Sequence, residues 1–242
     1  MLRIQTALTL ILIVLAGCAT APPPLLHEKY QVTQTNQVDE VEAAERVSTP
    51  LRSLARTAGS GDIFAGSYRR DPKTSIATGG LKSFSTIAAL RSSLPTDSHM
   101  KSLGITRAPD SERVPEEQYN VSVEGYIYAA SKESDNDFHL IVGDKDCAAA
   151  SCFINVEVSG LPQDPSESSY ATLTSVRTKF LAYFNNQEPK RAYKTFDPPI
   201  AVTLTGSVFF DVDHLAGSIG PAGFKPSSVW EIHPLTDITF EP

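Results

Sequence analysis

Cysteine is scarce in this chain, with three residues among 242, and no two of them have the C-x-x-C spacing. That absence argues against a thioredoxin-like redox centre, and Cys147 and Cys152 lack the further neighbouring ligands that a metal site needs. In an oxidising compartment, two cysteines five positions apart can close a small loop. We therefore favour a structural disulfide between Cys147 and Cys152 over a redox or metal role. In this pairing Cys18 takes no part in a disulfide within the chain.

Basic residues are scarce in the C-terminal part of the chain. Residues 114–242 contain eight Lys and Arg against 18 Asp and Glu, a net charge of −10, whereas residues 1–113 contain 13 against 10, a net charge of +3. Binding to phosphate backbones depends on Lys and Arg. We therefore do not expect nucleic acid as a partner; a cationic ligand, a metal ion or an uncharged partner fits this charge better.

Several catalytic motifs are absent from the sequence. It contains no G-x-S-x-G nucleophile elbow, no G-x-x-x-x-G-K-[ST] phosphate loop and no H-E-x-x-H zinc motif. The sequence therefore favours a non-enzymatic protein, and it leaves a metal-dependent enzyme as the alternative.

The N-terminus has the features of an export signal. Arg3 precedes a short apolar run over residues 7–15, and the run ends in Leu15-Ala16-Gly17-Cys18. Small residues at this point suit a signal peptidase, and the run is shorter than the ~20 residues of a membrane span. The alternatives are an ordinary cleaved signal and a short transmembrane anchor.

The same residues resemble the bacterial lipoprotein signal family. The resemblance implies that residues 1–17 are removed and that Cys18, diacylated on its thiol, becomes the N-terminus. Ala19, rather than Asp, follows this cysteine, and by resemblance to the enterobacterial sorting rule this implies the outer membrane, facing the periplasm. The lipid bilayer is then one partner, and an envelope protein or a glycan is another.

The rest of the chain divides into three parts. Residues 18–60 read as a tether, with a stiff Pro22-Pro23-Pro24 spacer and short helices within residues 38–58. Residues 61–113 are rich in Ser, Thr, Gly and Pro, and we expect a loosely ordered collar with one helix around Phe84, Ile87, Leu90 and Leu94. From residue 114 onward, apolar and polar residues alternate as in strands.

The pattern over residues 114–242 predicts a mainly β domain of order β-β-β-α-β-β. Strands are expected over 121–128, 137–142, 153–158, 200–210 and from 230 to the end, with a helix over 170–184. This is the element order of a five-stranded OB-like barrel, and Gly125 and Gly206 suit the bulges of so small a barrel. Another small barrel or a β-sandwich is the alternative. A staphylococcal-type nuclease, also built on an OB barrel, is not expected, because the predicted strands carry no arginine.

Histidines and acids gather at the strands of this domain. Residues two apart on a strand share a face, so Asp137 lies with His139, and Glu231 lies with His233. Imidazole and carboxylate together suit zinc or another divalent metal. The candidate ligands are His139, Asp211, His214, Glu231 and His233. The alternative is structural: these groups orient one another and hold loops.

A further candidate site is a polar strand face. Tyr126 and Tyr128 lie on the polar face of the first expected strand, where exposed rings could stack on a sugar or peptide. With Asp137, they are the candidate ligand-binding residues.

The domain also resembles a group of uncharacterised bacterial exported proteins. The resemblance is carried by Asp135-Asn136-Asp137-Phe138-His139, a D-x-D-[FY]-H element, and by Trp230-Glu231-Ile232-His233-Pro234. It implies a domain boundary near residue 114 and implies no activity. We therefore expect an envelope lipoprotein whose OB-like domain binds a protein, glycan or small ligand, and the alternative is a metal-dependent envelope enzyme.

Overall fold

The computed structural model describes residues 30–38, 61–214, 217 and 219–242. The expected signal peptide, Cys18, the proline spacer and most of the expected tether helices lie outside the described residues. Within the described ranges, no helix is long and apolar enough to cross a membrane.

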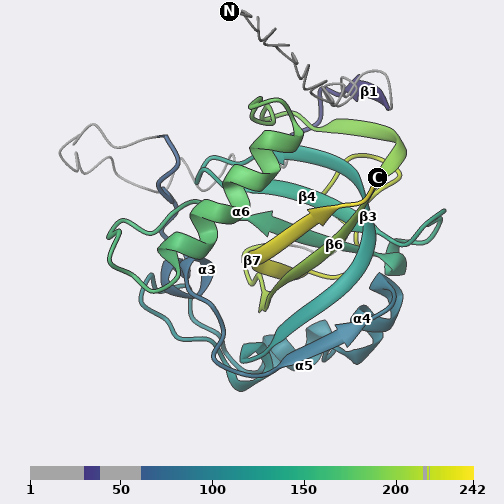
Figure 1. Cartoon of the computed structure of the whole chain (residues 1–242). Coiled ribbons are helices and arrows are strands. Elements are labelled where there is room, and N and C mark those ends of the chain that lie inside the picture. Colours follow the sequence, from purple (N-terminus) through teal and green to yellow (C-terminus); the bar gives the residue numbers. More distant parts are fainter. Residues whose placement is uncertain (1–29, 39–60, 215–216, 218) are drawn as a thin grey trace, which may run out of the picture.

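The described residues form a mainly β structure (Figure 1). One mixed sheet has the order β1-β6-β7-β5-β4-β3-β2. Its strands are β1 (Gln31–Gln34), β2 (Leu81–Phe84), β3 (Asn120–Lys132), β4 (Phe138–Gly143), β5 (Phe153–Val158), β6 (Lys194–Phe210) and β7 (Trp230–Phe240). The helices are α3 (Arg70–Thr74), α4 (Ile87–Ser93), α5 (Asp97–Ser102) and α6 (Tyr170–Tyr183).

Five of the strands form a ring. In addition to the sheet order, β6 pairs with β3, so that the pairings run β3-β4-β5-β7-β6 and back to β3. The β5–β7 pair is parallel and the other pairs of the ring are antiparallel. The predicted order of three strands, a helix and two strands is confirmed, with α6 between β5 and β6.

Gly206 lies where β6 and β7 cross closely. A Cβ at this position would lie 2.6 Å from Ile232 Cγ2, and the β6–β7 register shifts on both sides of Gly206. The predicted irregularity is therefore present here. In β3 the register shifts between Ile127 and Ala129 instead of at Gly125. Gly125 instead allows close approach of the strands, since a Cβ there would lie 2.8 Å from the side chain of Val142 on β4.

Residues 61–113 are more ordered than the loose collar that we expected, and the helix expected around Phe84, Ile87, Leu90 and Leu94 is confirmed by α4. They contain α3, β2, α4 and α5, and β2 pairs in parallel with β3. Ile87, Leu90 and Met100 are fully buried in the core. The Ser- and Thr-rich composition reflects helix capping, since Thr86 and Thr96 accept hydrogen bonds at the N-termini of α4 and α5.

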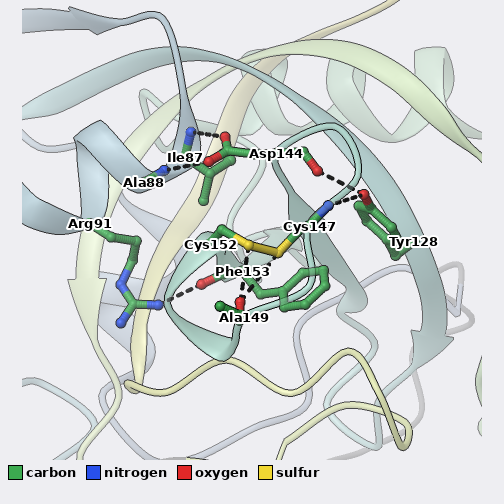
Figure 2. Close-up of a disulfide and its surroundings, with 9 residues drawn as sticks. All are labelled: Ile87, Ala88, Arg91, Tyr128, Asp144, Cys147, Ala149, Cys152 and Phe153. Atoms are coloured by element: carbon green, nitrogen blue, oxygen red, sulfur yellow. Dashed lines mark hydrogen bonds between the residues drawn. A yellow bond between two sulfur atoms is a disulfide. The ribbon is translucent and has the colours of Figure 1, made fainter.

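The predicted disulfide between Cys147 and Cys152 is confirmed, with Cα atoms 5.9 Å apart. Figure 2 shows the loop that it closes against α4. Asp144, just before the loop, accepts hydrogen bonds from the backbone N–H groups of Ile87 (2.6 Å) and Ala88 (3.1 Å). The disulfide loop therefore lies beside the point where α4 is fastened to the sheet.

Candidate metal centre

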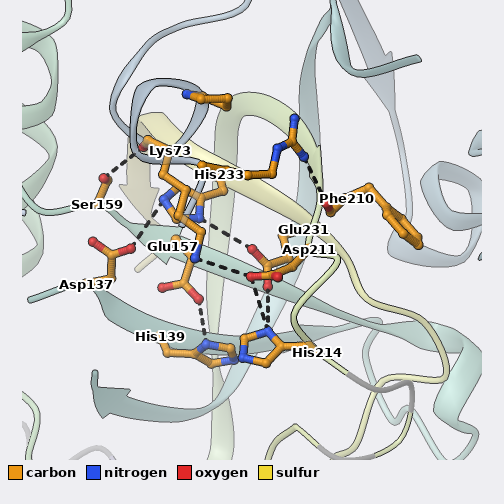
Figure 3. A network of polar contacts seen from close by, with 12 residues as sticks. Lys73, Asp137, His139, Glu157, Ser159, Phe210, Asp211, His214, Glu231 and His233 are labelled. Atoms are coloured by element: carbon orange, nitrogen blue, oxygen red, sulfur yellow. Dashed lines mark hydrogen bonds and ion pairs between the residues drawn. The ribbon is translucent and has the colours of Figure 1, made fainter. Parts of the chain in front are cut away.

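A cluster of polar side chains is buried on one face of strands β4, β5 and β7. On β5, Asn155 and Glu157 alternate with residues of the hydrophobic core, and on β7, Glu231 and His233 do the same. We call the whole set the polar cluster: Lys73, Glu133, Asp135, Asp137, His139, Asn155, Glu157, Asp211, His214, Glu231 and His233, none more than 8% exposed. Figure 3 shows most of its members converging from the strands, α3 and the segment after β6.

The first triad of the cluster consists of Glu133, His139 and Glu157. Antiparallel pairing sets His139 of β4 opposite Glu157 of β5, and Glu133 comes from the turn between β3 and β4. His139 Nδ1 lies 2.7 Å from Glu133 Oε1 and 2.5 Å from Glu157 Oε1. Among the described residues, neither ring nitrogen of His139 has a hydrogen-bond partner. The two contacts are therefore short, but they do not have the geometry of hydrogen bonds.

The second triad consists of Asp211, His214 and Glu231. His214 Nδ1 lies 3.3 Å from Asp211 Oδ2 and 3.6 Å from Glu231 Oε1. None of these three atoms has a hydrogen-bond partner in the part of the chain that the structure describes. Lys73 of α3 brings its Nζ to 3.3 Å from the same Asp211 oxygen.

His233 joins the second triad to Asp137. Its Nδ1 lies 3.4 Å from Glu231 Oε2 in a hydrogen bond, and its Nε2 lies 3.3 Å from Asp137 Oδ2. Asp137 also accepts a hydrogen bond of 2.5 Å from the backbone N–H of Gly160. Asp137 is fully buried, so it is closed to a ligand from solvent.

The electrostatics of the two triads differ. In the first, burial raises the pKa of the Glu133 and Glu157 carboxyls to about 7. Burial alone would lower the pKa of His139, but Glu157 and Glu133 raise it well above its usual value. When no other cation is present, bound protons therefore compensate the negative charge of the two carboxylates in the first triad.

In the second triad, the carboxylates are already compensated. Burial opposes ionisation of Asp211, yet Lys73 and His214 hold its pKa well below the usual range. Burial would lower the pKa of His214, but Asp211 and Glu231 raise it to about 10. Lys73 and His214 are thus both charged at pH 7, opposite two carboxylates.

The buried charges of the described residues do not balance. Seven Asp and Glu are buried against four Lys and Arg, an excess of three negative charges with neutral histidines. Arg69 and Arg177 pair with Asp or Glu outside the triads, and Arg113 donates to backbone carbonyls. Burying charge without compensation is very unfavourable, so the polar cluster requires protons or a bound cation.

The structure divides the metal ligands that the sequence suggested. It brings Asp211, His214 and Glu231 together, and His233 forms a hydrogen bond with Glu231. His139 lies instead with Glu133 and Glu157, and neither of those acids was among the candidates. Strand pairing opposite His139 could have indicated Glu157, but no local pattern connects Lys73 with these residues.

The expectation of an exposed tyrosine pair on the first strand is wrong for Tyr128. Only 6% of Tyr128 is exposed, because the register shift after Ile127 turns it inward. Its hydroxyl donates to the Asp144 carbonyl at 2.7 Å, and its ring contacts Phe153. Tyr126 is half-buried, so no two-ring stacking platform forms there.

Comparison with known proteins found no matching family model and no similar curated protein. The geometry of the polar cluster therefore has to carry the functional argument. The triad side chains are at most 7% exposed, an arrangement that can hold an ion and offers no open face to a large substrate.

Proposed function

We propose that this protein is a lipid-anchored envelope protein whose β domain binds one divalent metal ion, such as zinc, through Glu133, His139 and Glu157. The observation that carries the metal site is the position of His139 Nδ1 between two carboxylate oxygens, at 2.5 and 2.7 Å, without a hydrogen bond among the described residues. A cation that both carboxylate oxygens and the imidazole nitrogen can bind would stabilise this arrangement.

The donor set suits zinc. Zinc takes imidazole nitrogen and carboxylate oxygen at about 2.0–2.2 Å, so ligand atoms around a tetrahedral ion lie about 3.4 Å apart. His139 Nδ1 needs to move away from each of the two carboxylate oxygens by less than about 1 Å to admit the ion. A divalent ion with two carboxylates and a neutral imidazole is also uncharged overall, which removes the charge imbalance of this buried triad.

The metal would act on structure rather than on a substrate. Its ligands come from the turn before β4, from β4 and from β5, so the ion would fasten that turn to the sheet. The ligand side chains are at most 6% exposed, whereas a catalytic zinc keeps an open coordination position for water or substrate. This supports a binding protein over the alternative of a metal-dependent enzyme.

The proposal also includes the fold and the location. The β3–β6 pairing, the parallel β5–β7 pair and the place of α6 support an OB-like barrel. The Leu15-Ala16-Gly17-Cys18 motif supports acylation of Cys18 and an outer-membrane position facing the periplasm. A domain held near the membrane in this way is available to an envelope protein or glycan partner.

The test is zinc binding by the purified mature protein in detergent after removal of metal with a chelator. We expect one zinc per chain, and at about 100 times the dissociation constant a stabilisation of about 2.7 kcal/mol, or roughly 5–10 °C in melting temperature for a domain of this size. His139→Ala should lose both effects. His99→Ala is the matched control, because His99 is exposed and, among the described residues, forms an ion pair with Glu116 at the surface.

The metal proposal fails if the wild-type protein binds no zinc, or if His139→Ala binds as much as His99→Ala. Loss of binding in His214→Ala with retention in His139→Ala would move the site to the second triad.

A further inference from the structure

The second triad has the ligand types and spacing of a metal site, but a lysine already reaches it. We propose that Lys73 is the resident cation of Asp211, His214 and Glu231, and that its ammonium group keeps divalent ions out of this triad. The inference deepens the proposed function by setting the number of metal ions that the domain takes. It can fail separately, because it concerns a different set of residues.

The spacing of the second triad is that of a metal centre. His214 Nδ1 lies 3.3 and 3.6 Å from the two carboxylate oxygens, close to the ~3.4 Å between ligand atoms on a tetrahedral zinc. The residues are at most 7% exposed. Geometry alone would therefore let this triad bind an ion at least as readily as the first triad.

Hydrogen bonds to the backbone around Lys73 fix its position beside the second triad. Ser159 Oγ donates to the Lys73 carbonyl at 3.0 Å, and Arg113 Nη2 donates to the Pro72 carbonyl at 2.5 Å. On the other side, Ser169 Oγ donates to the carbonyl after Lys73 at 2.7 Å. Contacts from three separate parts of the chain thus fix α3, and the ammonium group reaches Asp211 from a fixed base.

Charge distinguishes the two triads. Lys73 Nζ lies 3.3 Å from Asp211 Oδ2, so a carboxylate of the second triad already has a cationic side chain beside it. A divalent ion would add two charges beside the ammonium at a site of low dielectric, where like charges repel strongly. Among the described ion pairs, Glu133 and Glu157 of the first triad meet only His139. The lysine therefore compensates the carboxylates of the second triad, whereas the carboxylates of the first triad are available to a metal ion.

The experiment counts zinc ions bound to the mature protein after equilibrium dialysis, by elemental analysis. We expect one ion in the wild type and two in Lys73→Met, whose side chain has a similar length and no charge. Lys73→Arg keeps the charge and should bind one. The double variant Lys73→Met/His214→Ala should return to one, which assigns the gained ion to the second triad.

The outcomes separate the two proposals. No ion in the wild type with one in Lys73→Met would refute the first-triad metal and support the role of Lys73. An unchanged count in a folded Lys73→Met variant, or two ions in the wild type, would overturn the role of Lys73.

A measurement on the wild type covers the case in which Lys73→Met does not fold. In protein labelled with ¹⁵N at the lysine side chains, the Lys73 ammonium resonance can be assigned by its absence in Lys73→Arg. We expect a protected resonance that keeps its position when zinc saturates the protein. Its loss or a large shift on zinc addition would show that metal replaces the lysine, contrary to the proposal.

Discussion

Glu117 forms the buried ion pair that holds the segment bearing Lys73 against the sheet. Its two oxygens accept from Arg69 at 2.7 and 2.8 Å, and both side chains are at most 1% exposed. The same oxygens accept the backbone N–H groups of Phe210 (2.9 Å) and Val114 (3.0 Å). Arg69 directly precedes α3, so the pair joins the 61–113 segment to the end of β6.

We predict that Glu117→Ala destabilises the protein by about 3–5 kcal/mol, because it leaves a buried guanidinium unpaired. The backbone N–H groups of Phe210 and Val114 also lose their acceptor, so we expect the loss to lie at the upper end of this range or above it. The loss is a large part of the ~5–15 kcal/mol by which proteins are usually stable. Urea unfolding followed by the fluorescence of Trp230 measures it, since Trp230 is buried in the core.

Glu116→Ala is the matched control for this substitution. Glu116 is the neighbouring residue and pairs with the half-exposed His99 at the surface, where an ion pair contributes about 0–1 kcal/mol. The paired replacement Arg69→Met/Glu117→Leu should recover the part of the loss that comes from the unpaired Arg69 guanidinium, while the N–H groups of Phe210 and Val114 still lack their acceptor. Equal urea midpoints for Glu117→Ala and Glu116→Ala would refute the reasoning.

Further predictions concern other parts of the chain. The acidic neighbours of His214 raise its pKa to about 10, so its contribution to stability is complete below the unfolded pKa of about 6.5 and is lost as the pH rises through 10. The loss of stability caused by His214→Gln should therefore shrink between pH 6 and 10. A loss that stays constant with pH in urea unfolding would contradict this. Reduction of Cys147–Cys152 should lower stability by about 2 kcal/mol for so short a loop, and identical melting with and without reductant would argue against it. Gly206→Ala should cost about 1–3 kcal/mol, because its Cβ would lie 2.6 Å from a β7 side chain; wild-type stability would show that the strands can separate there. Cys18→Ser should abolish metabolic labelling with palmitate, and continued labelling would disprove acylation at this residue.

Local patterns in the sequence were sufficient for the elements of residues 114–242. Helical spacing predicted a helix over 170–184, and α6 covers Tyr170–Tyr183. The alternation of apolar and polar residues predicted the strands, because one face of each strand packs on the core and residues of that face occur at every second position. In residues 61–113 the spacing of Ile87, Leu90 and Leu94 predicted the α4 helix, but other residues buried in the core, such as Met100, show no local period that marks them as buried.

The order of the strands and the helix, the cysteine pair and the clustering of histidines with acids could all be predicted from the amino-acid sequence. Periodicity and short spacing are local properties, so they are visible without a fold. Which of these groups meet depends on the three-dimensional packing. Strand pairing sets His139 opposite Glu157, and α3, from outside the predicted domain, brings Lys73 to Asp211. Such contacts depend on the register and on long-range packing, which no local pattern encodes.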